Sequence, residues 1–307
     1  MRVCAVVVSF NRLEKLGNCI TAIGKQTHQV DHLIVVDNAS TDGSDRYIEG
    51  LRSPTFTPVQ LRENLGGAGG FWRGIREAGR GDYDFIWVMD DDCVPEPDCL
   101  LRLLEVASAA PTSRFFFSRV VGPDGLTENV PDLAWSRQVL DFLPLAAIPC
   151  ETASFTSLMF RKDDFIRVGS PLKELFIWGD DAEYTRRLAW GGFGLACGRS
   201  VCLHDRKRGA SYDVWSEKDP RIIERYFYFY RNKYIVVRRY YSLLSRQGVS
   251  LCYATIIATW RSLRSGDQTW SRVSSIVRGV WAGCFFPYAA SLKSSNETEL
   301  TTFDRVR

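Results

Sequence analysis

Two short runs rich in β-branched residues, at the start of the chain, constrain its fold most strongly. Residues 1–9 and 32–37 each have the length and composition of a strand that is buried on both faces. Between them the apolar residues recur every three or four positions, which predicts a helix; they are Leu13, Leu16, Ile20 and Ile23. A strand, a helix and a second strand form one βαβ unit, so the sequence predicts a parallel sheet.

The chain continues this alternation of strands and helices as far as residue 121. Further strands are predicted at residues 59–61, 85–90 and 115–121. A short helix is predicted at residues 71–78, directly after the glycine-rich residues 64–70. Such an alternation is typical of nucleotide-binding α/β domains, so residues 1–121 are predicted to form a nucleotide-binding half.

The pattern becomes irregular after residue 121. Prolines separate short apolar pieces, which predicts a second, partly antiparallel portion over residues 122–210. A strand is expected at residues 154–160, and helices at 163–168 and 180–190. Apolar and aromatic residues then recur at helical spacing from 222 to 244, which predicts a long amphipathic helix within a helical region over residues 211–307.

Charge and cysteine content exclude several classes of protein. Thirty-nine Lys and Arg residues against 36 Asp and Glu leave a net charge of only +3, so the whole-chain charge does not indicate nucleic-acid binding. The nine cysteines show no CxxC or zinc-finger spacing, and we interpret them as buried thiols of a reducing, cytoplasmic compartment. No run of about 18 apolar residues occurs and the first apolar run is too short for a signal peptide, so neither a spanning helix nor secretion is expected.

Three consecutive carboxylates, Asp90, Asp91 and Asp92, end the predicted strand 85–90. Like charges this close are tolerated best where a cation or several hydrogen-bond donors lie between them. Alternate residues of an extended chain point the same way, so Asp90 and Asp92 are expected to converge while Asp91 turns to backbone or core partners. Carboxylates at the carboxyl end of a parallel strand suit Mg²⁺ or Mn²⁺ with a diphosphate as co-ligand. The alternative is a solvated turn at a strand end.

A second acidic group, Asp180, Asp181 and Glu183, begins the predicted helix 180–190. One interpretation is an N-cap with favourable charge in the first turn. The other is a general base that takes the proton of an attacking alcohol, and only one of the two adjacent aspartates can then point at a substrate. His204 is a candidate third metal ligand, or alternatively a hydrogen-bonded structural histidine.

The glycine-rich residues 64–70 do not match the dinucleotide-binding pattern, because the position three after Gly69 is Trp72. The chain also contains no GK[ST] sequence, so neither a Rossmann dehydrogenase nor a P-loop protein is predicted. Glycines at this place let the backbone approach a ligand closely and then begin a helix whose amides face it.

Five motifs occur in the order typical of one enzyme family. They are VVVSFNR at 6–12, VVDNASTDG at 35–43, NLGGAGG at 64–70, DDD at 90–92 and WGDDAEY at 178–184. In this order they resemble the family 2 inverting glycosyltransferases of GT-A fold, and among these they are most similar to the bacterial galactofuranosyltransferases. The resemblance covers roughly residues 1–210. It implies an α/β fold with a GT-A type, Rossmann-like nucleotide-binding sheet, a mixed C-terminal portion, and a helical tail rich in basic and aromatic residues.

The resemblance also implies roles for individual residues. Those that match nucleotide-binding positions are Ser9, Asn11, Arg12, Asp37, Asn64, Gly66, Gly67, Asp90 and Asp91, with Asp37 as the acceptor of a hydrogen bond from the uracil ring. Those that match the site of a Mn²⁺ or Mg²⁺ ion are Asp92, Asp90 and His204, with Asp92 as the direct ligand.

Asp181 matches the catalytic base, while Trp178 and Asp180 match the acceptor region. Gly179 is an insertion relative to some members of the family, and it leaves the choice between Asp180 and Asp181 open.

The implied activity is metal-dependent transfer of galactofuranose from a UDP-sugar donor, UDP-galactofuranose, to a lipid-linked glycan acceptor in bacterial cell-surface polysaccharide synthesis. The alternatives are a rhamnosyltransferase that uses dTDP-rhamnose, a nucleotidyltransferase, and a non-catalytic sugar-nucleotide-binding module. A nucleotidyltransferase is disfavoured because its basic, glycine-rich N-terminal motif is missing, and a binding module because candidates for the base and the metal ligands are present.

Basic and aromatic residues are concentrated in residues 221–278. The basic ones are Arg221, Arg225, Arg231, Lys233, Arg238, Arg239, Arg246, Arg261, Arg264, Arg272 and Arg278, against the acidic Glu224 and Asp267. This composition suits an anionic membrane surface, which predicts a peripheral protein on the cytoplasmic face of the cell membrane. A core helix with a solvated charged face is the alternative. Nucleic acid is not expected as a partner, because no nucleic-acid-binding module is recognisable.

Overall fold

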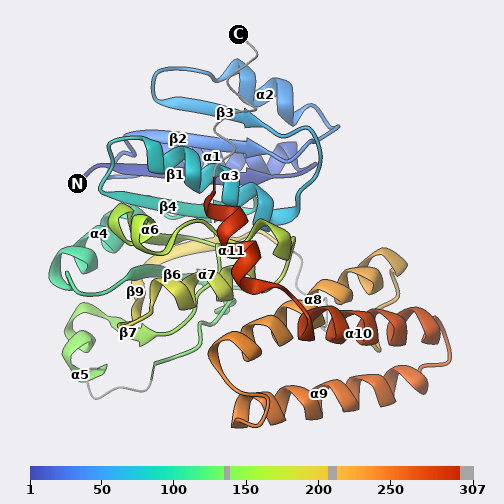
Figure 1. Ribbon diagram of the computed structural model, residues 1–307. Helices are drawn as coiled ribbons and strands as arrows, with labels where there is room; N and C mark the ends of the chain where they lie inside the picture. Colours follow the sequence, from blue (N-terminus) through green and yellow to red (C-terminus); the bar gives the residue numbers. More distant parts are fainter. Residues whose placement is uncertain (135–138, 207–212, 298–307) are drawn as a thin grey trace. The chain divides into compact units, whose positions relative to one another are not determined.

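The computed structural model describes residues 1–134, 139–206 and 213–297 (Figure 1). The described residues form two compact units. We call them the sheet unit, the described residues within 1–173 and 181–206, and the helical unit, the described residues within 174–180 and 213–297. Residues 211–212 and 298–307 of the predicted helical region lie outside the described part of the chain.

The sheet unit contains one nine-stranded sheet with the strand order β3-β2-β1-β4-β8-β6-β9-β5, and β7 also pairs with β9. The strands are β1 (Val3–Ser9), β2 (His32–Asp37), β3 (Phe56–Gln60), β4 (Phe85–Asp90), β5 (Cys93–Pro95), β6 (Phe115–Val121), β7 (Ala147–Cys150), β8 (Leu158–Arg161) and β9 (Gly194–His204). Strands β3, β2, β1 and β4 run parallel, whereas β8 is antiparallel to β4 and β6, and β5 and β7 are antiparallel to β9. A parallel half followed by a mixed half confirms the predicted fold class.

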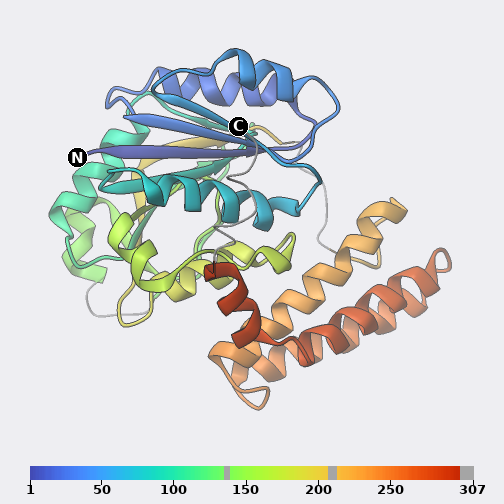
Figure 2. The ribbon, with the colours of Figure 1, turned by 45° about the horizontal axis from the view of Figure 1, so that its top comes forward.

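Helices cover both faces of this sheet (Figure 2). They are α1 (Leu13–Gly24), α2 (Ser44–Gly50), α3 (Gly66–Arg80), α4 (Cys99–Ala109), α5 (Val139–Phe142), α6 (Lys162–Val168) and α7 (Asp180–Leu188), with short 3₁₀ turns at Leu143–Leu145 and Lys173–Leu175. Alternate residues of β1 face opposite sides: Val7 joins the core under α1, α2 and α4, and Val6 joins the core under α3 and α7. Burial on both faces explains why the parallel strands are continuous apolar runs.

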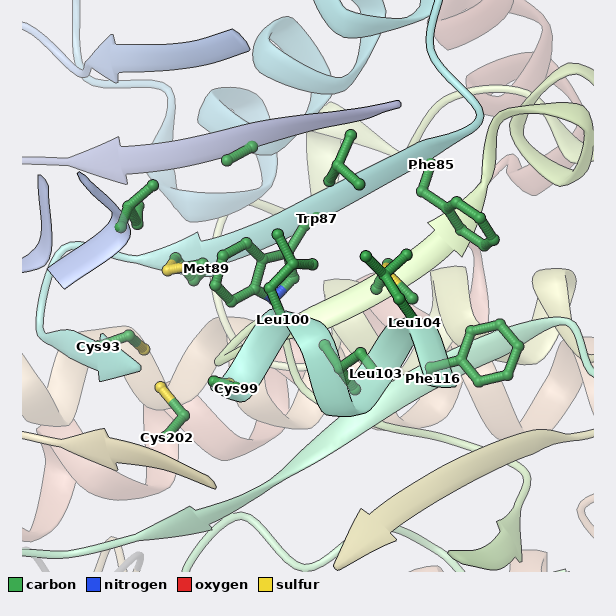
Figure 3. Packing of buried hydrophobic residues seen from close by; sticks show 14 of the residues in the cluster. Phe85, Trp87, Met89, Cys93, Cys99, Leu100, Leu103, Leu104, Phe116 and Cys202 are labelled. Atoms are coloured by element: carbon green, nitrogen blue, oxygen red, sulfur yellow. The ribbon is translucent and has the colours of Figure 1, made fainter. Parts of the chain in front are cut away.

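The core on the α4 side packs around strand β4. Figure 3 shows the side chains of Trp87, Met89, Leu100, Leu103 and Phe116 together in this core. The indole Nε1 of Trp87 donates a hydrogen bond to Ser157 Oγ at 3.0 Å, so the one polar atom of this fully buried ring is satisfied. Such packing makes β4 a rigid support for Asp90 at its end and for Asp91 and Asp92, which follow it.

The glycine-rich residues belong to helix α3, which begins at Gly66 rather than at the predicted residue 71. A methyl group at Gly70 would lie 2.3 Å from Cγ1 of Val8, and one at Gly74 would lie 2.4 Å from Cγ1 of Val6. These two glycines therefore let α3 pack closely against β1. Close helix–sheet packing thus accounts for glycine at these two positions.

The helical unit contains α8 (Pro220–Tyr240), α9 (Arg246–Leu263), α10 (Thr269–Cys284) and α11 (Tyr288–Asn296). The core of the helical unit lies between α8, α9 and α10. Apolar and aromatic residues at helical spacing on α8, such as Tyr226 and Tyr230, pack there with Ala258 of α9 and Ile276 of α10. None of the helices in the described ranges is long and apolar enough to cross a membrane.

Several side chains join residues 174–180 to the rest of the helical unit, and one of them, Asn232, is fully buried. The amide Nδ2 of Asn232, on α8, lies within hydrogen-bond distance of three carbonyl oxygens, those of Leu175 at 2.9 Å, Ile177 at 3.0 Å and Trp178 at 2.8 Å. Gly179 has φ +96°, and a side chain there would lie 3.3 Å from Asn232 Cβ. The glycine of the WGDD motif is thus required by a left-handed backbone beside Asn232.

Candidate functional site

Three of the predicted site residues lie together at the carboxyl edge of the parallel strands. In the sheet register, Ser9 of β1 is opposite Asp37 of β2, and Asp90 of β4 is opposite Val8 of β1. β1 and β2 thus end level with each other, and β4 ends one residue earlier. This edge is where open α/β sheets bind their ligands.

Asp91 is buried and engaged within the sheet unit. Its Oδ2 accepts a hydrogen bond from Ser9 Oγ at 2.8 Å and its Oδ1 one from Arg12 Nη1 at 3.0 Å. Burial raises the pKa of Asp91, and the Arg12 charge and the Ser9 hydroxyl only partly oppose this effect. Ser9, Arg12 and Asp91, all three predicted to bind nucleotide, therefore form one network behind the edge of the sheet.

Asp92 lies between two cationic or potentially cationic side chains. Its Oδ2 accepts a hydrogen bond from Arg12 Nη1 at 2.8 Å, and its Oδ1 lies 3.2 Å from Nε2 of His204. Burial alone raises the pKa of Asp92, but hydrogen bonding and charge from His204 and the charge of Arg12 outweigh it, so the pKa falls below its usual value. The Asp92 side chain is thus ionised and aimed at His204.

Of the alternation expected through the three aspartates, the inward turn of Asp91 is seen in its contacts with Ser9 and Arg12. Strand β4 ends at Asp90, and Asp91 and Asp92 form a turn before β5 begins. Because extended geometry stops at Asp90, the predicted convergence of Asp90 with Asp92 cannot be read from strand periodicity. The ion pairs of the described residues instead join Asp91 and Asp92 through Arg12.

His204 is brought to Asp92 by strand pairing, because the antiparallel ladder of β5 with β9 places Cys93 opposite His204. The other ring nitrogen, Nδ1, is buried and lies 3.6 Å from Oε2 of Glu128, beyond hydrogen-bond distance. Arg206 Nε donates a hydrogen bond to the same Glu128 oxygen at 3.0 Å. Glu128 was missed by the sequence interpretation, since it lies in the irregular region between prolines where no periodicity marks it.

The donor atoms at this place suit a hard divalent cation. Asp92 offers carboxylate oxygen and His204 offers imidazole nitrogen, both buried, and Glu128 lies behind the histidine in the position of an outer carboxylate. In the described ranges, however, no three His, Cys, Asp or Glu side chains are grouped so that they could hold a metal ion by themselves. A cation bound by Asp92 and His204 would need further oxygens from a ligand, as diphosphate provides.

Asp37 carries a buried acceptor atom that no group in the described part of the chain donates to. Its Oδ2 accepts a hydrogen bond from the backbone N of Ser40 at 3.1 Å, whereas its Oδ1 is buried without a hydrogen-bond partner among the described residues. A buried carboxylate oxygen left unpaired is destabilising by about 1–3 kcal/mol, more when it is charged. The arrangement therefore favours a ligand that donates a hydrogen bond to Asp37.

Asn11 and Asn64 hold the loops around Asp37. Asn11 has φ +52°, and its Oδ1 accepts a hydrogen bond from the backbone N of Thr41 at 2.7 Å. Asn64 Oδ1 accepts one from the N of Gly66 at 2.8 Å. Asn38, which the sequence interpretation did not single out, accepts from the N of Leu65 and donates to the O of Gly66. The side chains of Asn11 and Asn64 thus order the backbone of the predicted nucleotide site, and Gly67 lies with them at the start of α3.

The three acidic residues at the start of α7 differ in their contacts. Glu183 is fully buried and pairs with Arg187, whose Nε lies 2.7 Å from its Oε1, so it anchors the helix. Asp181 Oδ1 accepts a hydrogen bond from the backbone N of Ala182 at 2.7 Å, a contact within the first turn of α7. Asp180 is buried and Asp181 is more exposed. Trp178 lies in the helical unit against Tyr226, with ring centroids 5.5 Å apart.

Solved structures show which fold this arrangement shares. The TarS 1–349 structure from S. aureus superposes with a TM-score of 0.60 at 14% identity, over 91% of this chain and 81% of that one. The mannosyltransferase PcManGT from Pyrobaculum calidifontis, in complex with GDP-Man and Mn²⁺, superposes with a TM-score of 0.56 at 17% identity, over 96% and 85%. These likenesses support the GT-A fold.

Sequence relatives identify the family. The galactofuranosyltransferase GlfT1 of Mycolicibacterium smegmatis is 34% identical over 215 residues, which are 66% of this chain and 70% of that one. The GlfT1 of Mycobacterium tuberculosis H37Rv is 31% identical over 212 residues, 66% and 69% of the two chains. The model of glycosyl transferase family 2 matches residues 4–168, more than half of the chain. The chain therefore belongs to glycosyl transferase family 2 and is a glycosyltransferase.

Proposed function

We propose that this glycosyltransferase transfers galactofuranose from UDP-galactofuranose, with inversion and with Mn²⁺ or Mg²⁺, to a lipid-linked glycan acceptor of the bacterial cell surface. The observation that carries the proposal is the approach of Asp92 Oδ1 to His204 Nε2, 3.2 Å apart at the carboxyl edge of a nucleotide-binding type of sheet. The similarity to proteins named galactofuranosyltransferase supports galactofuranose as the sugar.

The nucleotide is proposed to lie along the strand edge from Asp37 to Asp92. The unpartnered Oδ1 of Asp37 is an acceptor for the N3–H of uracil. Asn38 and Asn64 keep the start of α3 in place, where the backbone of Gly66 and Gly67 can approach the ribose and the donor sugar.

The diphosphate is proposed to lie at Asp92 and His204. These two residues would hold the divalent cation, with Asp90 beside them at the strand end, and the cation would supply charge stabilisation for the departing diphosphate. Arg12 lies within 3.0 Å of both Asp91 and Asp92, where its positive charge also favours an anionic ligand. Solved neighbours with the same fold were crystallised with Mn²⁺ and a nucleotide or nucleotide sugar, which supports this cation for the present chain.

Asp181 is proposed as the general base. It takes the proton of the acceptor hydroxyl while that oxygen forms a bond to the anomeric carbon, and the bond from this carbon to the diphosphate breaks, so UDP leaves on the opposite face. Its neighbours Asp180 and Trp178 are proposed to contact the acceptor. Because the attack is a single in-line displacement, the configuration at the anomeric carbon inverts.

The site of action is proposed to be the cytoplasmic face of the cell membrane. All nine cysteines are free, which suits a reducing compartment. A lipid-linked acceptor presents its glycan at a membrane surface, so the enzyme must work next to one.

The proposal is tested with a panel of donors in the presence of Mn²⁺, Mg²⁺ or EDTA, with release of the nucleotide as the signal. We expect UDP release from UDP-galactofuranose with a lipid-linked glycan acceptor, and its loss in EDTA. Release of dTDP from dTDP-rhamnose instead would identify a rhamnosyltransferase. Tight donor binding without release, with every acceptor offered, would support the binding module.

A further inference from the structure

Helices α9 and α10 bury small or polar side chains and expose large apolar ones. The buried residues are Gly248, Thr255, Ala258 and Ser262 of α9, and Arg272, Ser275, Ile276, Gly279 and Gly283 of α10. The exposed ones include Val249, Tyr253, Ile256, Trp260 and Leu263 of α9, Trp270, Val277 and Trp281 of α10, and Phe285 directly after it. A helix on the surface of a water-soluble domain normally shows the reverse distribution.

The small inner residues are required by close helix packing within the helical unit, where Figure 1 shows α8, α9 and α10. A methyl group at Gly279 would lie 2.6 Å from the carbonyl oxygen of Phe227, and one at Gly283 would lie 2.5 Å from that of Arg231. Large side chains therefore do not fit on the face of α10 that contacts α8. Because α10 packs closely against α8, its large side chains lie on the outer face.

The exposed apolar residues of α9 form one continuous stripe. Val249, Tyr253, Ile256, Trp260 and Leu263 follow one another at intervals of four, three, four and three residues. At about 100° per residue these five positions fall within an arc of about 80°. A narrow stripe of this kind is a contact surface, whereas single exposed apolar residues need no partner.

The charges beside the stripe are all positive. Three arginines lie along one side of the stripe: Arg246 and Arg261 of α9, and Arg264 directly after it. Arg278 is exposed on α10. Neither α9 nor α10 contains Asp or Glu, and Asp267 between them pairs with the buried Arg272 at 2.7 Å. A partner of this surface must therefore be apolar and anionic at once.

We propose that the exposed faces of α9 and α10 bind an anionic lipid bilayer. The tryptophan, isoleucine and leucine side chains enter the boundary between headgroups and acyl chains, and the arginines contact lipid phosphates. This deepens the proposed function, because it gives the enzyme a surface for the membrane that carries its acceptor. A second copy of the same face would place arginine against arginine, so the charge favours lipid over self-association.

Helix α8, the most basic of the four by sequence, contributes less to this surface than its composition predicts. Arg238 Nη1 donates a hydrogen bond to the carbonyl oxygen of Gly283 at 3.1 Å, and the Arg239 guanidinium lies 5.0 Å from the ring centre of Tyr288. These two arginines hold α10 and α11 within the helical unit. The variants that test lipid binding therefore belong on α9 and α10.

The experiment compares matched substitutions on the two units of the full chain. Ile256→Asn and Trp281→Asn change the proposed lipid-binding face. Ile256 is 65% exposed and Trp281 is 67% exposed. Ile166→Asn and Trp190→Asn make the same changes in the sheet unit, at residues 66% and 65% exposed. Binding is measured by cosedimentation with phosphatidylcholine vesicles, with and without phosphatidylglycerol.

We expect the unaltered chain to bind vesicles that contain phosphatidylglycerol and to be released by salt. Each substitution on α9 or α10 should weaken the partition coefficient about tenfold, and the sheet-unit controls should leave it unchanged. Absence of binding, or equal loss in all four variants, overturns the proposal. A dimer that Trp281→Asn dissociates also overturns it, because the face would then join two copies.

The failure of this proposal can be told apart from failure of the proposed function. Vesicle binding needs neither donor nor acceptor, and UDP release with a short water-soluble acceptor needs no membrane. We expect Ile256→Asn to keep this release while it loses vesicle binding. An unaltered chain that binds vesicles but never releases UDP would count against the proposed transfer from UDP-galactofuranose alone.

Discussion

His204 Nε2 lies 3.2 Å from Asp92 Oδ1, although the two residues are far apart in the chain. The antiparallel pairing of β5 with β9 sets this distance, because Cys93, the residue after Asp92, is opposite His204 in the ladder. Glu128 lies next to the other ring nitrogen of His204, and Arg12 donates a hydrogen bond to the other carboxylate oxygen of Asp92. The order carboxylate, imidazole, carboxylate is the arrangement in which an outer acidic group orients a metal-binding histidine.

Asp92→Ala is expected to abolish the metal-dependent part of UDP affinity. The substitution removes the carboxylate that, with His204, would hold the cation against the diphosphate. Calorimetric titration of UDP in Mn²⁺ and in EDTA should give the same dissociation constant for this variant and different ones for the unaltered chain. Asp98→Ala, which removes only the exposed ion pair with Arg102, serves as control. An Mn²⁺ effect that survives in Asp92→Ala would refute the metal site.

Glu128→Gln is expected to weaken Mn²⁺ binding by about ten- to a hundredfold while the fold stays intact. Glu128 lies 3.6 Å from His204 Nδ1 and would act on the cation only through the ring, as a positioning residue. Mn²⁺ affinity in the presence of UDP is read by electron paramagnetic resonance, together with the melting temperature. Unchanged Mn²⁺ affinity would show that the carboxylate serves Arg206 only.

Asp37→Ala is expected to weaken binding of UDP by about ten- to a hundredfold, because a hydrogen bond to a charged acceptor contributes about 1.5–3 kcal/mol. The effect should be equal in Mn²⁺ and in EDTA, since Asp37 Oδ1 is proposed to face the base and not the diphosphate. UDP affinity within about twofold of the original, less than 0.5 kcal/mol, would exclude the uracil role.

The parallel half of the sheet and the edge it presents could be predicted from the sequence. Strands that are apolar on both faces and end in Ser9, Asp37 and Asp90 place these residues at one edge of the sheet once the strands are parallel. Periodicity could not reveal what depends on turns, such as the contact of both Asp91 and Asp92 with Arg12. It also could not reveal Glu128, which lies in an irregular segment.

Asn232 could have been found. It is a polar residue in the buried stripe of α8, between Tyr230 and Tyr234, where an unpaired amide would be destabilising. Such a residue indicates that its side chain forms hydrogen bonds with buried backbone groups. Which backbone it is, residues 175–178, could not be predicted because no local pattern connects these two places in the chain.

Gly70→Ala and Gly67→Ala, in the same helix, should differ in stability. A methyl group at Gly70 would lie 2.3 Å from Val8 Cγ1, whereas one at Gly67 would meet no atom within 4 Å. We expect Gly70→Ala to lower the free energy of unfolding by about 1–3 kcal/mol, and Gly67→Ala to leave it unchanged or raise it by up to about 1 kcal/mol. Urea unfolding followed by circular dichroism measures both. Equal stability of the two variants would mean that α3 does not depend on glycine to reach β1.

Asp181→Asn is expected to lower turnover by about 10² to 10⁴ with little change in donor affinity. Asparagine keeps the size of the side chain and can still accept the hydrogen bond from the Ala182 N–H, but it cannot take a proton from the acceptor hydroxyl. Single-turnover rates with UDP-galactofuranose, together with UDP titrations, separate the chemical step from binding.

Asp180→Asn is the matched control, one residue earlier in the same helix. Asp180 begins α7, where a negative charge is favourable, so the loss of its charge should appear mainly as a lower melting temperature and a weaker acceptor affinity. If Asp180→Asn slows the chemical step and Asp181→Asn does not, the two roles are reversed and Asp180 is the base. If neither variant slows it, the acidic start of α7 is structural, as Glu183 already is, and the proton must go to a group outside this helix.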